Sequence, residues 1–443
     1  MIPALKPYPK YNATQSPWLQ EIPDSWDFRR AKTILNERNE KGFPNEPLLA
    51  ATQSKGVVRK ENFETRTVLA QKDLHNLKLV QVDDFVISLR SFQGGIEYAR
   101  EKGIISPAYT ILFPFDSRNQ RYLSWLFKSK DYIDNLKLHV TGIREGQNID
   151  YVKLSRSRIP IPTRSDQKAI VRYLDYMDRR IQKYIAAKEK LIQLLEEQKQ
   201  AVIHQAVTRG LDPDVPLKPS GVEWLGDIPK HWELSQGRGC LSIKKQVNTG
   251  MIESKVLSLS YGNIVIKPKE KLHGLVPESF ETYQLIYPGD IVCRPTDLQN
   301  DKKSLRFGLS QEQGIITSAY LRFTIKENIN EDYVYLLLHA YDILKVIYRL
   351  GSGLRQNLSW DDFKSLPILL PPLPEQEAIV EFVNKIRIET KYSIDRLEQE
   401  IDLLNEYQKS LISNIVTGKI DIREMASNTS DYIDTSTTLE VYT

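Results

Sequence analysis

The longest regular pattern of apolar and polar positions runs through residues 165–208, which contain neither proline nor glycine. Apolar residues recur there in steps of three and four, with Lys188 and Gln198 as polar exceptions. A repeat of about 3.5 residues is typical of a helix that faces a partner helix in a coiled coil. Gly210 and Pro213 follow and mark a helix end. The pattern therefore predicts a long helix over 163–209.

Residues 374–417 repeat this stretch at an offset of 209, without insertion or deletion. The repeat predicts a second long helix over 373–420, and two equal helices with apolar stripes are expected to pack on each other as an antiparallel coiled coil. The expected seam consists of Leu174, Met177, Ile181, Leu191, Leu195, Val202, Val383, Ile386, Leu397, Leu404 and Leu411. Two unrelated long helices, each packed on its own domain, remain the alternative.

The segments before the two helices also match each other. The motif Trp-Leu-x-x-Ile-Pro-x-x-Trp begins at Trp18 and again at Trp224, an offset of 206. Gly-Ile-Ile-Ser/Thr begins at Gly103 and again at Gly314, an offset of 211. The chain is thus written twice, as globular domain, long helix, globular domain, long helix.

Short runs of β-branched and aromatic residues between turn signals predict a mixed α+β fold for each globular domain. Strands are expected at 85–89, 104–106, 109–113, 256–260, 291–293 and 320–325, and helices at 118–130 and 331–348. The predicted fold is two mixed α/β target-recognition domains separated by two long helices, with a pseudo-two-fold internal repeat. Its boundaries are expected at 1–162, 163–209, 210–372, 373–420 and a polar tail at 421–443.

Composition narrows the possible classes of protein without naming one. The 443 residues are 41% hydrophobic and 27% charged, which is ordinary for a soluble protein of two or three domains. Two cysteines indicate a reducing compartment, and no signal peptide or membrane-spanning run is evident, so we expect a cytoplasmic protein without membrane association. The net charge is only +4, so nucleic-acid binding would require local basic patches.

Catalytic signatures do not survive inspection. The phosphate-binding loop, the dinucleotide fingerprint, the zinc-protease motif and the nucleophile elbow are all missing from the sequence. Asp214, Glu253 and Lys255 loosely mimic a nuclease cluster, but so weak a pattern is expected by chance. The six histidines are scattered, and no metal site is predicted. The chain is therefore interpreted as a binding protein, with no catalytic residue and no cofactor of its own.

The change of offset from 206 to 211 locates the difference between the two halves in the loops 90–102 and 294–306. Arg, Asn and Gln read base edges, whereas Lys mainly contacts phosphate. The DNA-binding candidates in these loops are Arg90, Gln93, Arg100, Lys102, Arg294, Asn300, Lys302, Lys303 and Arg306. A second pair of loops adds Arg144, Gln147, Asn148, Arg355, Gln356 and Asn357. Surface loops that have drifted without any role remain the alternative.

These residues carry a resemblance to the specificity subunits of Type I restriction–modification enzymes. The doubled Trp-Leu-x-x-Ile-Pro-x-x-Trp openings, Gly-Asp-Ile-Val at 289–292, Gly-Ser-Gly-x-x-Gln-Asn at 351–357 and Leu-Pro-Glu-Gln-Glu-x-Ile-Val at 373–380 resemble that family. The first long helix departs from the pattern, because Thr-Arg-Ser-Asp-Gln at 163–167 replaces Pro-Leu-Pro-Glu-Gln.

The resemblance implies a non-catalytic subunit that recognises a bipartite, asymmetric sequence in double-stranded DNA, one half-site per domain. It implies two modification subunits that use S-adenosylmethionine to methylate adenine, and restriction subunits that use ATP and Mg²⁺. The coiled coil would set the spacer and dock the methyltransferase subunits. The alternatives are a coiled-coil scaffold without sequence-specific DNA binding and an enzyme with an unrecognised site.

Overall fold

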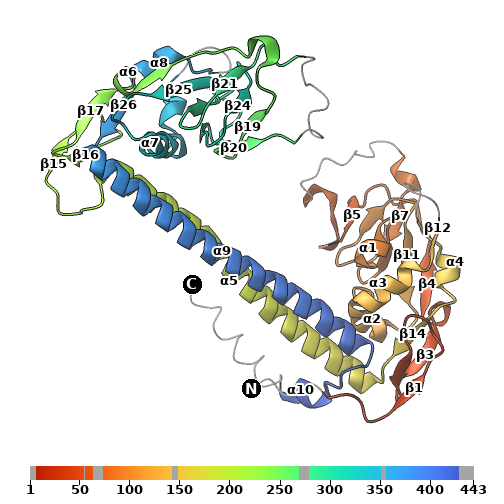
Figure 1. Cartoon of the computed structure of the whole chain (residues 1–443). Coiled ribbons are helices and arrows are strands. Elements are labelled where there is room, and N and C mark those ends of the chain that lie inside the picture. The colour runs from red at the N-terminus through yellow and green to blue at the C-terminus, as the bar shows by residue number, and fades with distance from the viewer. Residues whose placement is uncertain are drawn as a thin grey trace. The chain divides into compact units, whose positions relative to one another are not determined.

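The computed structural model describes residues 6–53, 55–62, 73–141, 148–268, 279–350 and 356–428. They divide into two compact units (Figure 1). Unit 1 comprises residues 1–188 and 398–443, and unit 2 comprises residues 189–397. Each unit therefore joins one globular domain to one end of each long helix. The mixed α/β class predicted from the sequence is confirmed.

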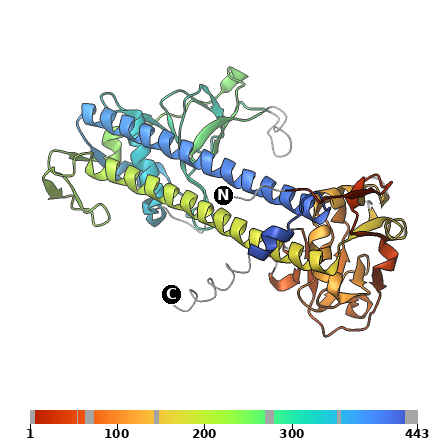
Figure 2. The same ribbon diagram turned by 90° about the horizontal axis from the view of Figure 1, so that it is seen from below.

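The two long helices are α5 (Arg164–Arg209) and α9 (Leu373–Val416). In unit 1 their segments lie side by side (Figure 2). Gln408 Nε2 donates to Asp178 Oδ1 at 2.5 Å, and Lys188 forms an ion pair with Glu400. Residue numbers rise along α5 as they fall along α9, so the two segments are antiparallel.

The sheet of unit 1 runs in the order β4 (Leu35–Arg38), β11 (Thr110–Pro114), β8 (Phe85–Ile87) and β9 (Glu97–Tyr98), with antiparallel neighbours. Side chains alternate across it, as the two-residue period of a strand requires. Phe85 and Leu112 face the main core with α2 (Gln120–Leu126), while Val86 and Ile111 face a second cluster on the opposite side.

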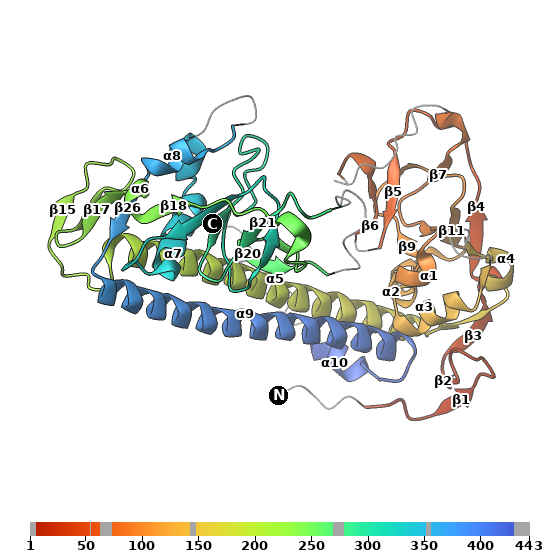
Figure 3. The same ribbon diagram turned by 45° about the horizontal axis from the view of Figure 1, so that its top comes forward.

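The remaining elements of unit 1 surround this sheet. β5 and β6 form a hairpin on the side of the second cluster, near β7 and β9 (Figure 3). The other elements are β1 (Tyr11–Ala13), β2 (Glu21–Pro23), β3 (Asp27–Arg30), β5 (Leu49–Thr52), β6 (Gly56–Arg59), β7 (Lys78–Val80), β10 (Gly103–Ile105), β12 (Val140–Thr141), β13 (Asn148–Ile149), β14 (Arg158–Ile161), α1 (Ser91–Gly94), α3 (Lys130–Lys137), α4 (Tyr151–Leu154) and α10 (Arg423–Asn428).

The sheet of unit 2 has the corresponding order β18 (Leu241–Ile243), β25 (Leu321–Ile325), β22 (Ile291–Cys293) and β23 (Phe307–Leu309). One face packs on α7 (Glu331–Ile343), and Val292 on the other face joins a cluster with the hairpin of β19 and β20. The other elements are β15 (Leu217–Pro219), β16 (Asp227–Pro229), β17 (Glu233–Gln236), β19 (Leu257–Ser260), β20 (Asn263–Ile266), β21 (Gln284–Ile286), β24 (Gly314–Ile316), β26 (Pro367–Leu370), α6 (Gly237–Cys240) and α8 (Trp360–Lys364).

The repeated tryptophans fasten the helix ends. Trp26 Nε1 donates to Asp166 Oδ2 at 2.9 Å at the start of α5, and Trp232 Nε1 donates to Glu375 Oε1 at 3.0 Å at the start of α9. Gly418, at φ +77°, packs on Trp26 just beyond the end of α9, where a Cβ would lie 2.4 Å from Pro23 Cδ. Only glycine fits that turn without strain.

Buried tyrosines complete the fastening. Tyr122 Oη donates to the carbonyl oxygen of Val416 at 2.8 Å, and Tyr333 Oη donates to that of Val207 at 3.2 Å. In each unit a domain therefore holds the first residues of one long helix and the last residues of the other.

The predicted seam agrees with burial in α9 but shifts in α5. Val383 and Leu411 are buried, whereas Leu191 is 46% exposed. Ile185 is buried and Ile192 partly buried, so the inward stripe takes two consecutive steps of four at Met177–Ile181–Ile185. Such a step relaxes the strict seven-residue repeat toward the 3.6-residue period of a straight helix. The assignment of Leu191 to the seam is wrong for this structure.

Two further predictions differ from the structure. The helix expected at 118–130 is divided into α2 and α3, because Ser129 caps a new helix by accepting from the Tyr132 amide. The segment after Asp421, expected to be part of a polar tail, begins as α10, and Ile422, Met425 and Ala426 are buried in the main core of unit 1. These few apolar side chains outweigh the polar composition of the segment. The domain boundaries stay predictions.

Candidate nucleic-acid interface

The loop 90–102 of unit 1 lies between the strands of the sheet. Arg90 precedes α1, Gln93 lies within α1, and Arg100 and Lys102 follow β9. All four side chains are exposed. Gln93 Oε1 accepts from Gln53 Nε2 at 3.5 Å, which joins this loop to the tip of the β5–β6 hairpin.

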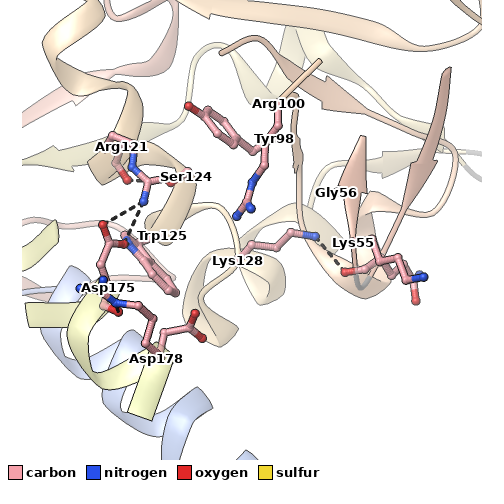
Figure 4. Close-up of a pocket in the computed structure, with 12 residues that line it drawn as sticks. Lys55, Gly56, Tyr98, Arg100, Arg121, Ser124, Trp125, Lys128, Asp175 and Asp178 are labelled. Atoms are coloured by element: carbon pink, nitrogen blue, oxygen red, sulfur yellow. Dashed lines mark hydrogen bonds and ion pairs between the residues drawn. The ribbon is translucent and has the colours of Figure 1, made fainter. Parts of the chain in front are cut away.

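An open cleft of about 790 Å³ lies beside this loop (Figure 4). The Arg100 side chain points into the cleft, and Lys55 lies on the hairpin wall. On the opposite wall the Arg121 guanidinium donates to both oxygens of Asp175 at 2.9 Å, and Trp125 Nε1 donates to Asp175 Oδ1 at 3.0 Å. Arg121 and Asp175 thus tie α2 to α5, while the basic groups offered to a ligand come from the loop and the hairpin.

Lys128 has a supporting role in the same cleft. Its Nζ donates to the carbonyl oxygens of Gly94 at 2.9 Å and Gln53 at 3.2 Å, and lies 2.6 Å from Glu97 Oε2. The Glu97 side chain is 2% exposed. Burial raises the pKa of this carboxyl to about 7, although the Lys128 charge opposes the shift. The pair clamps α1, the hairpin tip and β9 together.

In unit 2 the loop 294–306 carries an internal network. Arg294 pairs with Asp301 at 3.2 Å, and Asn300 Nδ2 donates to Asp297 Oδ1 at 2.7 Å. Hydrogen bonds from Ser304 lower the pKa of Asp301 to about 2, with a contribution from the Arg306 charge. Lys302 and Lys303 are exposed between these anchors. The network fixes the loop and leaves the two lysines at its surface.

Arg306 is not a surface residue. Its side chain is fully buried, and its guanidinium donates to the carbonyl oxygens of Thr296 at 2.6 Å, Asp297 at 3.3 Å and Asp301. Nε also donates to Tyr348 Oη at 3.2 Å. Five donors in a planar fork suit such a collection of carbonyls. The assignment of Arg306 as a DNA contact is therefore corrected: it is the internal support of the loop.

The second pair of candidate loops is described only in part. Arg144, Gln147 and Arg355 lie outside the described residues, and Asn148 is described only by its backbone in β13. Gln356 Nε2 donates to the carbonyl oxygens of Tyr348 at 2.5 Å and Leu350 at 3.0 Å. Asn357 Oδ1 accepts from the Asp297 amide at 3.0 Å. Gln356 and Asn357 therefore anchor the base of the loop.

The sequence interpretation missed the β5–β6 and β19–β20 hairpins as parts of the surface. Gln53 and Lys55 flank one tip, and Tyr261 and Asn263 the other. Gly56 and Gly262, both at positive φ, were the available turn signals. Sequence could not show that these tips pack beside the variable loops.

Other site chemistry was sought in the same coordinates. Within the described ranges, no group of three or more His, Cys, Asp and Glu residues is placed to hold a metal ion. None of the helices described is both long and apolar enough to cross a membrane.

Comparison with known proteins gives consistent matches. The family described as "Type I restriction modification DNA specificity domain" matches residues 309–402. A putative type I restriction enzyme MjaX specificity subunit from Methanocaldococcus jannaschii is 23% identical over 430 residues, covering 91% of this chain and 95% of that protein.

Solved structures show the same fold. A structure described under complex assembly and conformational transition of the type I R-M system aligns with a TM-score of 0.64 at 13% identity, covering 90% of this chain and 99% of the other. The HsdS subunit from Thermoanaerobacter tengcongensis aligns with a TM-score of 0.49 at 13% identity, covering 90% and 97%. The matched specificity domain, the full-length sequence relative and the motifs at both helix starts together place this chain in the family of Type I restriction–modification specificity subunits.

Proposed function

We propose that each globular domain of this chain reads one half of a bipartite, asymmetric sequence in double-stranded DNA. One observation carries the proposal: the two domains share a sheet order and a way of holding helix ends, yet present different side chains at equivalent loops. Arg90, Gln93 and Arg100 stand where unit 2 has Asn300, Lys302 and Lys303. A common scaffold with different polar surfaces suits two related but distinct ligands, and the family supplies their class, DNA.

The long helices are proposed to set the spacer between half-sites and to dock two modification subunits. What supports docking is their exposed apolar side chains, because large apolar groups on a helix surface mark interaction sites. They are Tyr184, Leu403 and Tyr407 in unit 1, and Leu191, Leu194, Ile388 and Tyr392 in unit 2. In unit 1, Tyr184 and Leu403 line a shallow, largely apolar cleft of about 310 Å³.

In the proposed complex this chain contributes recognition and no catalysis. S-adenosylmethionine would be bound by the modification subunits, and ATP with Mg²⁺ by restriction subunits. The residues described here would orient DNA and partners.

The function is tested by mapping methylated adenines across a genome with and without this chain. We expect one bipartite motif with a fixed spacer to become methylated only when the chain is present. A methylation pattern unaffected by its loss would favour a scaffold role.

Modularity is tested by exchanging residues 1–150 for the corresponding domain of another specificity subunit. Because each domain reads its own half-site, only one half of the methylated motif should change. The methylated motif of the unaltered chain is the control. A change in both halves would contradict one domain per half-site.

A further inference from the structure

The β19–β20 hairpin of unit 2 ends in a two-residue turn with an unusual residue choice. Tyr261 and Gly262 have φ values of +47° and +79°, as in a type I′ turn. Asn, Asp or Gly normally occupies the first position, because other side chains are strained there. Tyr335 Oη donates to the Gly262 carbonyl oxygen at 2.9 Å and fixes the tip.

The side chains at this tip face solvent. Tyr261 is 89% exposed, although aromatic rings are usually buried. Asn263 is exposed beside it, and its Nδ2 donates to the Tyr261 carbonyl oxygen at 3.3 Å. The hairpin therefore presents a ring and an amide on a rigid, strained turn.

This tip lies against the basic loop. A Cβ added at Gly262 would lie 3.0 Å from Leu305 Cδ1, and one at Gly308 would lie 2.6 Å from Leu259 Cδ1. The tip is thus packed beside the segment that carries the exposed Lys302 and Lys303. An exposed ring flanked by cations and an amide matches the chemistry of a nucleic-acid surface, where Lys contacts phosphate and rings contact bases.

Unit 1 has a hairpin in the same place with a different tip. Leu48 bridges Ile104 in parallel, just as Val256 bridges Ile315. A Cβ at Gly94 would lie 2.7 Å from Gln53 Cγ, so this hairpin also packs beside its variable loop. The scaffold position is shared, whereas one tip carries Gln53 and Lys55 and the other carries Tyr261.

We propose that the hairpin tips belong to the DNA-reading surface, and that Tyr261 places its ring against a base of the half-site read by unit 2. This inference rests on the proposed function and adds a specificity-determining residue to it. The ring supplies a contact that the lysines cannot make, because ammonium groups meet phosphate whatever the sequence.

The test uses the assembled complex of this chain with its modification subunits and a pool of random-sequence duplexes. The variants are Tyr261→Asn, which suits the turn, and Tyr261→Phe, which keeps the ring. Ile252→Ala, which truncates a 70% exposed apolar side chain outside the hairpin, is the matched control. Selected sequences give the motif, and titration of the selected duplex gives its affinity.

Tyr261→Asn should weaken binding about 10- to 100-fold and relax one or two positions of a single half-site, the range expected for loss of one ring–base contact. Tyr261→Phe and Ile252→Ala should stay within about threefold of the unaltered complex. A photo-crosslinking phenylalanine analogue at position 261 should attach to bases of that half-site.

An unchanged motif and affinity for Tyr261→Asn, or crosslinks to protein alone, would overturn the role of Tyr261. An equal loss for Tyr261→Phe would overturn the ring contact. If the unaltered complex selects no bipartite motif, the proposed function itself fails, and that result is distinct from failure of the hairpin inference.

Discussion

Arg306 and Lys302 are four residues apart in one loop and have opposite surroundings. The Arg306 guanidinium is enclosed by carbonyl oxygens, whereas Lys302 faces solvent. Burial, not residue type, therefore decides which cation supports the loop and which is available to phosphate.

Replacing Arg306 should destabilise unit 2. Arg306→Met leaves the carbonyls of Thr296 and Asp301 without their donor, so we expect a loss of about 3–5 kcal/mol in the free energy of unfolding, measured by urea denaturation. Lys302→Met is the matched control and should leave stability within about 0.5 kcal/mol while weakening DNA binding. Full stability of Arg306→Met would contradict the support role.

Glu97 gives unit 1 a pH dependence. Its pKa in the folded chain is about 7, above the ordinary value of 4.5, so the folded state binds the proton more tightly. The resulting stabilisation is fully present below about pH 4.5 and is lost as pH rises through about 7.

The difference in unfolding free energy between the unaltered chain and Glu97→Gln should therefore shift against the unaltered chain across this window, by at most about 3 kcal/mol. Denaturant titrations at several pH values measure it. Glu61→Gln, at an exposed position, should show almost no such change. A pH-independent difference for Glu97→Gln would show that the carboxyl titrates normally.

At the scale of elements, the long helices depend on phase as well as length. Their inward stripe is continuous, and four residues advance a helix by about 400°, close to one full turn, whereas two residues rotate it by about 200°. Insertions of different length therefore separate the effect of length from that of packing.

Four residues inserted in α5 between Glu196 and Glu197, with four more in α9 near Thr390, should lengthen each helix by about 6 Å with its stripe nearly in phase. We expect a longer preferred spacer with both half-sites unchanged, measured by selection from random duplexes. Two-residue insertions at the same places should turn the stripe outward and lower the melting temperature. An unchanged spacer after the four-residue insertion would contradict the ruler.

At the scale of the whole molecule, each unit is built from both halves of the sequence. Unit 1 includes the end of α9 and α10, whose Ile422 and Met425 enter its core, and unit 2 includes the end of α5. Neither half of the chain therefore contains a complete unit.

Two fragments, 1–209 and 210–443, should consequently assemble when expressed together. Copurification through a tag on one fragment, followed by thermal denaturation, measures this association. A break after Lys188, inside α5, is the control and should assemble poorly because it interrupts the helix. Two fragments that fold separately as monomers would contradict the shared construction.

Much of the fold could be predicted from the sequence, because its signals are local. Gly210 marks the end of α5, and the strand predicted at 291–293 has the bounds of β22. The candidate site was predicted less well. The sequence identified Lys302 and Arg306 as equivalent cations, and it gave Tyr261 no role, because neither burial nor the neighbours of a turn are local properties.

The sequence alone determined the two long helices, the repeated motifs and the family resemblance, since periodicity and spacing are recorded along the chain. Tertiary structure decided that Trp26 meets Asp166, that Ile185 rather than its neighbour Tyr184 faces inward, and that a hairpin tip lies beside Leu305. These outcomes depend on packing between segments distant in sequence, where burial and close contact select among side chains that the sequence leaves equivalent.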